Sequence, residues 1–171
     1  MLGYVTVDGA GVADDLLAEL ADCLRARGWP LAGAVQVNPD GARDGRCHMD
    51  LHILASHEVI RISQDLGALS RGCRLDPEGL ERAAGLAEAA LAGTDQVWLA
   101  IANKFGKTEI DGRGFRPFIG KALGQGIPVL VAVGSGNLPG FLAFADGMAE
   151  PVAPEIDALL AWAEAATAEP A

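Results

Sequence analysis

Basic and polar side chains follow a buried apolar run in the stretch 95–121, DQVWLAIANKFGKTEIDGRGFRPFIGK. Residues 97–102 have no polar alternation, which predicts a strand covered on both faces, as in a parallel sheet. The run stops at Asn103, and Lys104 and Lys107 follow in a glycine-containing turn. Because ligands of open α/β sheets bind beyond the carboxyl ends of the strands, this turn is a candidate site. The alternative is a solvated loop that keeps a buried strand soluble.

Charge is distributed unevenly along the 171 residues. Residues 61–74 and 103–121 hold eight of the 13 basic residues and three of the 23 acidic ones, a net of +5. The remainder carries −15, so the whole chain has a net charge of −10. Such a partition predicts that a small anion is attracted locally while polyanions are repelled, which argues against nucleic-acid binding. Alternatively, the two basic segments lie apart, each on its own solvated face.

Arginine forks, ammonium groups and backbone amides suit tetrahedral oxyanions. We therefore predict an anion-binding site where the two basic segments meet. Its charged members would be Arg71, Arg74, Lys104, Lys107, Arg113 and Arg116, and its neutral donors Ser70, Asn103, Ser135 and Asn137.

Cys73 lies between Arg71 and Arg74, and its thiol would ionise more readily if both guanidinium groups lie close. We expect Lys107 and these two arginines to converge on one pocket at the carboxyl edge of the sheet, with Cys73 at the rim. A half-buried structural thiol is the alternative for Cys73.

Few residues are candidates for catalysis or metal binding. Glu109 is the candidate base if the protein is an enzyme. His48, Asp50 and His52 share one face of a predicted strand, which makes a metal site conceivable. Exposed imidazoles on an edge hairpin are the preferred interpretation, so no metal is predicted.

Apolar runs and turn signals predict a three-layer α/β fold with a mainly parallel sheet and helices on both faces. Strands are expected at 2–7, 31–38, 97–102 and 127–133, a β-hairpin at 47–54 and 58–63, and a short edge strand at 150–152. Helices are expected from after residue 11 to residue 28, at 77–92, up to about 123, and at 138–145 and 154–166. Asp76 is the expected cap of the helix at 77–92, and Pro77 is its first residue. The 97–102 and 127–133 strands should be adjacent in the centre. We expect a single domain over 1–167 and a frayed tail at 168–171.

The turn 8–11, between the first strand and the first helix, is the context in which a phosphate-binding loop occurs. Gly11 is followed by Val12 and Ala13, however, where such a loop has lysine and a hydroxyl residue. Asp14 and Asp15 come next and would repel phosphate, although acids suit a helix start. The phosphate function is therefore predicted to be absent.

The apolar runs and the N-terminal residues indicate where in the cell the protein is expected. No apolar run approaches the ~20 residues that span a bilayer, and the N-terminal residues have no signal-peptide pattern. We expect no membrane insertion and a cytoplasmic location. Three widely spaced cysteines, Cys23, Cys47 and Cys73, argue against a disulfide framework and a zinc site.

The stretch 102–109, ANKFGKTE, resembles the pattern I-D-E-I-G-K-M-E of small bacterial and archaeal nucleoside-triphosphatases related to the cancer-related NTPase of vertebrates. The Gly-Lys and the last Glu match. The resemblance implies a P-loop-NTPase-like fold. Asn103 and Lys104 replace the Walker B Asp-Glu pair and the Walker A Lys-Ser/Thr is missing, so little remains to hold Mg²⁺ or position water.

The segments RISQDLG, SRGCRLDP and NKFGKTEIDGRGFR also resemble an uncharacterised bacterial domain family whose members tend to be encoded beside molybdate-transport genes. They fall on the two basic segments. This resemblance implies a role in molybdate or tungstate handling.

Three functions are open. The preferred one is a non-catalytic protein that binds a small oxyanion such as molybdate, tungstate or phosphate. The second is a divergent nucleotide-binding hydrolase or transferase. The third is an interaction module, a degenerate NTPase that docks on a transporter or on a metalloenzyme-assembly partner in molybdenum metabolism.

Overall fold

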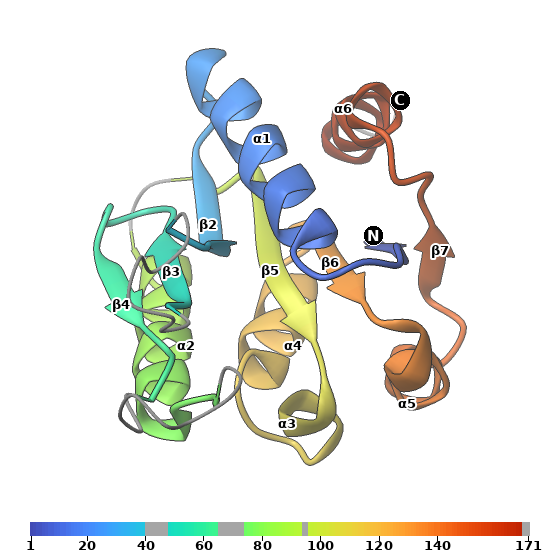
Figure 1. Cartoon of the computed structure of the whole chain (residues 1–171). Helices are drawn as coiled ribbons and strands as arrows, with labels where there is room; N and C mark the ends of the chain where they lie inside the picture. The colour runs from blue at the N-terminus through green and yellow to red at the C-terminus, as the bar shows by residue number, and fades with distance from the viewer. Residues whose placement is uncertain (40–47, 65–73, 94–95, 169–171) are drawn as a thin grey trace.

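The computed structural model describes residues 1–39, 48–64, 74–93 and 96–168. Its centre is a seven-stranded sheet in the order β4-β3-β2-β5-β6-β1-β7 (Figure 1). The strands are β1 Leu2–Val5, β2 Leu31–Val37, β3 Asp50–Ile53, β4 Val59–Arg61, β5 Leu99–Phe105, β6 Val129–Val133 and β7 Ala149–Pro151.

The sheet is mainly parallel. The pairs β2–β5, β5–β6, β6–β1 and β1–β7 are parallel, and β3 and β4 add an antiparallel hairpin beside β2. The adjacent central strands β5 and β6 carry the two unbroken apolar runs, as predicted. All of β6 and residues 99–103 of β5 are buried, because helices cover both faces.

The described residues form six α-helices: α1 Val12–Ala26, α2 Pro77–Leu91, α3 Lys107–Ile110, α4 Arg116–Gly124, α5 Leu138–Ala145 and α6 Ile156–Thr167, with a short 3₁₀ turn, η1, at Ser135–Asn137. Side chains of α1 and α6 pack on one face of the sheet. Those of α2, α4 and α5 pack on the other. The predicted three-layer α/β fold is confirmed.

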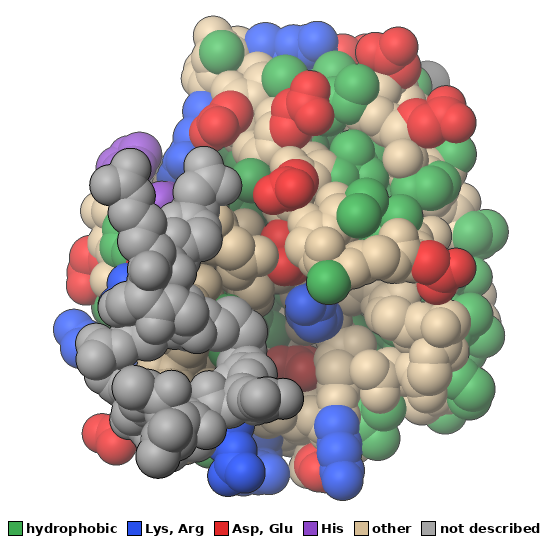
Figure 2. Space-filling model, viewed as in Figure 1, with side chains coloured by type: hydrophobic (Ala, Val, Ile, Leu, Met, Phe, Trp, Pro, Cys, Tyr) green, Lys and Arg blue, Asp and Glu red, His purple; other side chains and the backbone are tan. Residues whose placement is uncertain are grey.

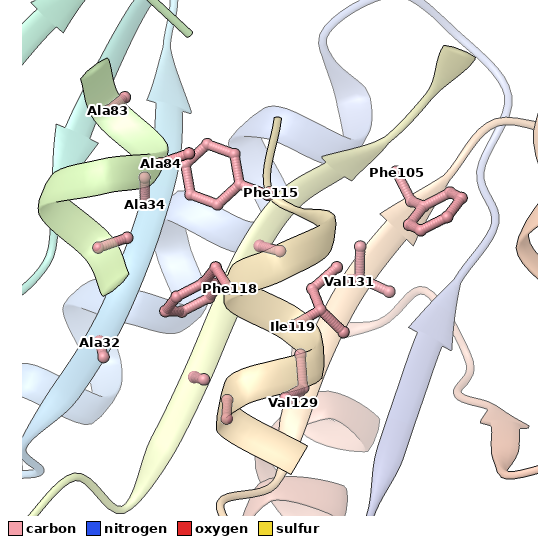
Figure 3. Close-up of a cluster of buried hydrophobic side chains, with 14 of the residues drawn as sticks. Ala32, Ala34, Ala83, Ala84, Phe105, Phe115, Phe118, Ile119, Val129 and Val131 are labelled. Atoms are coloured by element: carbon pink, nitrogen blue, oxygen red, sulfur yellow. The ribbon is translucent and has the colours of Figure 1, made fainter. Parts of the chain in front are cut away.

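The core on the α2–α4 side combines large aromatic and small side chains (Figure 3). Phe118 and Ile119 of α4 are fully buried on this side of the sheet, in one cluster with Val129 and Val131 of β6. Ala83 of α2 belongs to the same cluster, and alanines on α2 allow the helix to approach the sheet closely. This packing determines how closely α2 and α4 lie to the strands that end at the candidate site.

Two predicted boundaries were wrong. The strand does not end at Asn103, because β5 continues to Phe105 with Asn103 buried, Lys104 exposed and Phe105 buried, the alternation of a strand. The helix expected up to about residue 123 is divided into α3 and α4. Gly112 and Gly114 separate them with positive φ angles of 90° and 61°, which interrupt helical hydrogen bonding.

The start of α2 confirms another sequence prediction. Pro77 is its first residue, and the Asp76 carboxylate accepts a hydrogen bond of 3.1 Å from the backbone N–H of Glu78. This is the cap expected from Asp-Pro-Glu.

Among the helices that the structure describes, none is long and apolar enough to cross a membrane.

Candidate functional site

A buried carboxylate lies at the carboxyl edge of the sheet, where the parallel strands end. It belongs to Asp14 in the first turn of α1, and the residue is only 3% exposed. Gly11 caps this helix with a φ of 79°, and Val12 and Ala13 occupy its first two positions. A phosphate loop would have lysine and a hydroxyl residue here, so the first turn of α1 supplies a negative charge and no phosphate ligand.

Amide side chains from two strands hold Asp14 in place. Asn103 of β5 donates from Nδ2 to Asp14 Oδ1 at 2.9 Å, and Gln36 of β2 donates from Nε2 to Oδ2 at 3.2 Å. Asn38 donates to the same Oδ2 at 3.1 Å. Asn103 Oδ1 in turn accepts the backbone N–H of Gln36 at 2.7 Å. These bonds compensate for the burial of the carboxylate and join α1, β2 and β5.

Lys104 supplies the nearby positive charge. Its Nζ lies 3.5 Å from Asp14 Oδ1, and its side chain is 55% exposed. Lys104 therefore lies within the central strand, near its end, and the carboxylate lies on the helix. At this distance the Asp14 carboxylate balances part of the Lys104 charge.

A pocket of ≈ 340 Å³ opens next to this pair, on the α2 side of the sheet. Polar residues of its lining are Lys104, Lys107, Thr108, Gln36 and Asn103. Figure 2 shows Lys and Arg side chains at the lower end of the face, near the position of α3 in Figure 1, and others at its upper end among Asp and Glu side chains. The two lysines of the lining lie beside two carboxylates, those of Glu109 in the lining and of Asp14 at Lys104.

Glu109, the candidate base, is 4% exposed and also lines the pocket. Its Oε2 accepts the backbone N–H of Gly106 at 2.9 Å, and its Oε1 accepts that of Phe115 at 3.1 Å. Burial raises the pKa of the Glu109 carboxyl, and these backbone bonds partly oppose the rise. Both oxygens hold the 106–115 loop together, which is a structural task.

Arg116 also serves the fold of this loop. Its Nη1 donates to the carbonyl oxygens of Glu109 and Ile110 at 3.3 and 3.1 Å, at the end of α3. The guanidinium carbon lies 4.9 Å from the centre of the Phe144 ring, a cation–π contact. These contacts orient the guanidinium toward α3 and α5.

The other predicted anion ligands are distributed around the same edge. Arg113 is exposed between α3 and α4, and Arg74 is exposed just before α2. Ser135 is exposed in η1, and Asn137 Nδ2 lies 3.9 Å from the position that a Cβ on Gly106 would take. Ser70, Arg71 and Cys73 lie outside the described residues, so their convergence with Lys107 stays a prediction.

Sequence reasoning missed the central position of Asp14 and of Gln36. Asp14 was interpreted as an ordinary acid of a helix start, and Gln36 lies within a strand that reads as apolar. A polar residue inside an otherwise buried strand was the available signal, because such a group needs a partner.

The histidine-containing hairpin has a different arrangement. Asp50 is bonded to Arg61, with Arg61 Nε 2.8 Å from Asp50 Oδ1. This hydrogen bond is the main reason why the pKa of Asp50 is lowered. Within the described residues, no group of three or more His, Cys, Asp or Glu side chains is arranged to hold a metal ion.

Comparisons with known sequences relate the chain to one protein family and to part of a transport protein. A model of a protein family of unknown function, DUF2478, matches residues 2–162. The molybdenum import ATP-binding protein ModC 2 of Bradyrhizobium diazoefficiens is 34% identical over 149 residues, which are 87% of this chain and 16% of that protein. The chain thus spans about a sixth of the length of this relative.

The solution structure of a human cancer-related nucleoside triphosphatase superposes with a TM-score of 0.63 at 18% identity. The match covers 99% of this chain and 98% of that one. This likeness shows the fold and agrees with the P-loop-NTPase-like architecture.

Proposed function

The chain belongs to the DUF2478 family of proteins of unknown function, and from this premise we propose that it is a non-catalytic protein that binds a small oxyanion. Two lysines on one pocket carry this function: Lys104 and Lys107 line the pocket at the end of the central strand. Thr108 adds a hydroxyl donor to the same lining. Charge-assisted hydrogen bonds of this kind contribute ~1.5–3 kcal/mol each.

Molybdate and tungstate are the preferred anions, with phosphate as the third candidate. The similarity to part of a molybdenum import protein supports this order. Several charge-assisted contacts would give affinities around micromolar after the cost of association. Arg74 and Arg113, both exposed near the same edge, would add long-range attraction.

Hydrolysis of nucleotides has less support. Val12 and Ala13 supply no group for phosphate or Mg²⁺, and Asp14 adds a negative charge beside them. Glu109 uses both carboxylate oxygens for backbone bonds. A general base must reach the proton that it abstracts, and these bonds direct both oxygens toward the backbone of the 106–115 loop.

Isothermal titration with molybdate, tungstate, phosphate and ATP, with and without Mg²⁺, tests the proposed function. We expect one oxyanion to bind at a 1:1 ratio, and Mg²⁺ to leave its affinity unchanged. Absence of heat with all three oxyanions at ~10 mM, where even millimolar affinity would be visible, would refute oxyanion binding.

A further inference from the structure

The pocket beside Lys104 is larger and more apolar than a tetrahedral oxyanion needs. Its volume is ≈ 340 Å³. Four oxygen atoms fill the space of about four waters, or roughly 120 Å³ at ~30 Å³ for each water. The volume instead lies near the lower end of the range of roughly 300–1,000 Å³ that is typical for organic ligands.

The lining divides into two parts. Apolar side chains come from the region of the β3–β4 hairpin and from the starts of α2 and α4: Met49, Leu51, Ile62, Leu75, Leu80 and Phe115. The polar part is formed by the end of β5 and the start of α3, where Lys104 is half exposed and Lys107 exposed. An apolar wall with a few convergent polar groups is the usual form of a site for an organic molecule.

We propose that the pocket binds an organic oxyanion, a phosphate ester or a similar monoester whose apolar body is about the size of one or two rings. The oxyanion would lie against Lys104 and Lys107, and the organic part against the apolar side chains. This inference rests on the proposed function, since it assigns the same lysines to the anionic group and names the class of compound that carries it.

The charges at the pocket favour a ligand with a single anionic group at the lysines over a ligand with a polyphosphate chain. Asp14 lies beside Lys104, and Asp15 is exposed on the same turn of α1, so a chain of phosphates that extends toward α1 would meet two carboxylates. Glu109 faces its own loop through hydrogen bonds from Gly106 and Phe115. The lysine end therefore favours a ligand with one anionic group. A second anionic group at the apolar end would lose its hydration without gaining a partner.

The apolar wall can be changed without opening the core. Leu75 is 38% exposed and lies just before α2, so Leu75→Ser removes apolar surface from the pocket with little effect on folding. Leu142→Ser is the matched control, because Leu142 is 43% exposed on α5 and is not among the pocket residues. Met49→Gln gives a second, independent change on the β3 side of the pocket.

The experiment compares inorganic phosphate, 1-naphthyl phosphate and 1-naphthol by isothermal titration of the full chain. We expect 1-naphthyl phosphate to bind at least tenfold more tightly than either of the other two. Leu75→Ser and Met49→Gln should each reduce this advantage at least threefold and leave phosphate binding unchanged, whereas Leu142→Ser should change nothing. Lys107→Ala should weaken both phosphate compounds.

Each other outcome decides between the two proposals. Equal affinity for phosphate and naphthyl phosphate would refute the organic ligand and leave oxyanion binding intact. Equal affinity for naphthyl phosphate and naphthol would indicate a purely apolar site and refute the inference. If 1-naphthyl phosphate keeps its higher affinity over phosphate in both Leu75→Ser and Met49→Gln, the inference is also refuted, because the aryl group would then bind elsewhere. If no oxyanion, organic or inorganic, binds, both proposals are refuted.

Discussion

The carboxylate of Asp14 and the amide of Asn103, 89 positions apart in the chain, are joined by a hydrogen bond of 2.9 Å at the carboxyl edge of the sheet. The bond connects the first turn of α1 to the central strand β5. The helix thus supplies an acid, and the strand supplies an amide and a lysine.

The buried Asp14 network should contribute strongly to stability. Asp14→Ala leaves the donors of Asn103 and Gln36 without their acceptor, and we expect the free energy of unfolding to fall by about 2–5 kcal/mol. Urea denaturation measures this change. Asp15→Ala is the control on the same turn, and an exposed acid at a helix start contributes only ~0.3–1 kcal/mol. Equal effects of the two changes would mean that the network does not hold α1 to the sheet.

Glu109 should make stability depend on pH. Burial raises the pKa of its carboxyl in the folded chain above the ordinary 4.5, so the folded state holds this proton more tightly than the unfolded state. The stabilising contribution is complete below about pH 4.5 and is lost as the pH rises through the raised folded pKa. Glu109→Gln removes this titration.

We therefore expect the stability of the natural protein relative to Glu109→Gln to decrease as the pH rises above about 4.5. Urea denaturation at several pH values measures the difference. A difference that is constant over these pH values would show that Glu109 titrates normally in the folded state.

Gly114 should tolerate substitution less well than Gly112. Both have positive φ, where alanine costs about 1–2 kcal/mol. A Cβ on Gly114 would also collide with the Glu109 carboxylate, whereas a Cβ on Gly112 would meet nothing within 4 Å. Gly114→Ala should therefore lower the melting temperature clearly more than Gly112→Ala does. The opposite order would argue against the loop arrangement around Glu109.

Lys107 should determine oxyanion affinity. Lys107→Ala removes one charge-assisted contact of ~1.5–3 kcal/mol, and we expect affinity for the bound oxyanion to fall tenfold or more. Lys121→Ala on α4 is the matched control, because Lys121 is exposed and outside the pocket. Binding should also weaken between ~50 and ~500 mM salt if the lysines are open to solvent. Equal affinities of the two variants would place the anion elsewhere.

The protein should not hydrolyse ATP or GTP at an ordinary enzymatic rate. Val12 and Ala13 at the start of α1, and Asn103 and Lys104 on β5, leave no group to bind Mg²⁺ in the usual way. A phosphate-release assay with Mg²⁺ measures this. Turnover of ~1 s⁻¹ or faster that is lost in Glu109→Gln would contradict the expectation.

Much of the fold follows from local pattern in the sequence. The apolar runs that became β5 and β6 predicted central parallel strands, since a strand with no polar alternation needs cover on both faces. Asp76 and Pro77 predicted the start of α2, because a cap and a proline act on their own turn. The absence of lysine and a hydroxyl residue after Gly11 is equally a property of the sequence alone.

The tertiary structure decided which polar groups meet. Asp14, Gln36 and Asn103 come from three elements, and their bonds of 2.7–3.2 Å depend on how α1 is rotated against the ends of β2 and β5. Asn103 was expected to face an anion, and only the continuation of β5 to Phe105 turns its amide toward α1. Lys104 and Lys107 could be predicted from the sequence as members of one site, because charge is visible along the chain. The apolar residues that line their pocket could not be predicted, because they come from separate elements that only the folded chain brings together.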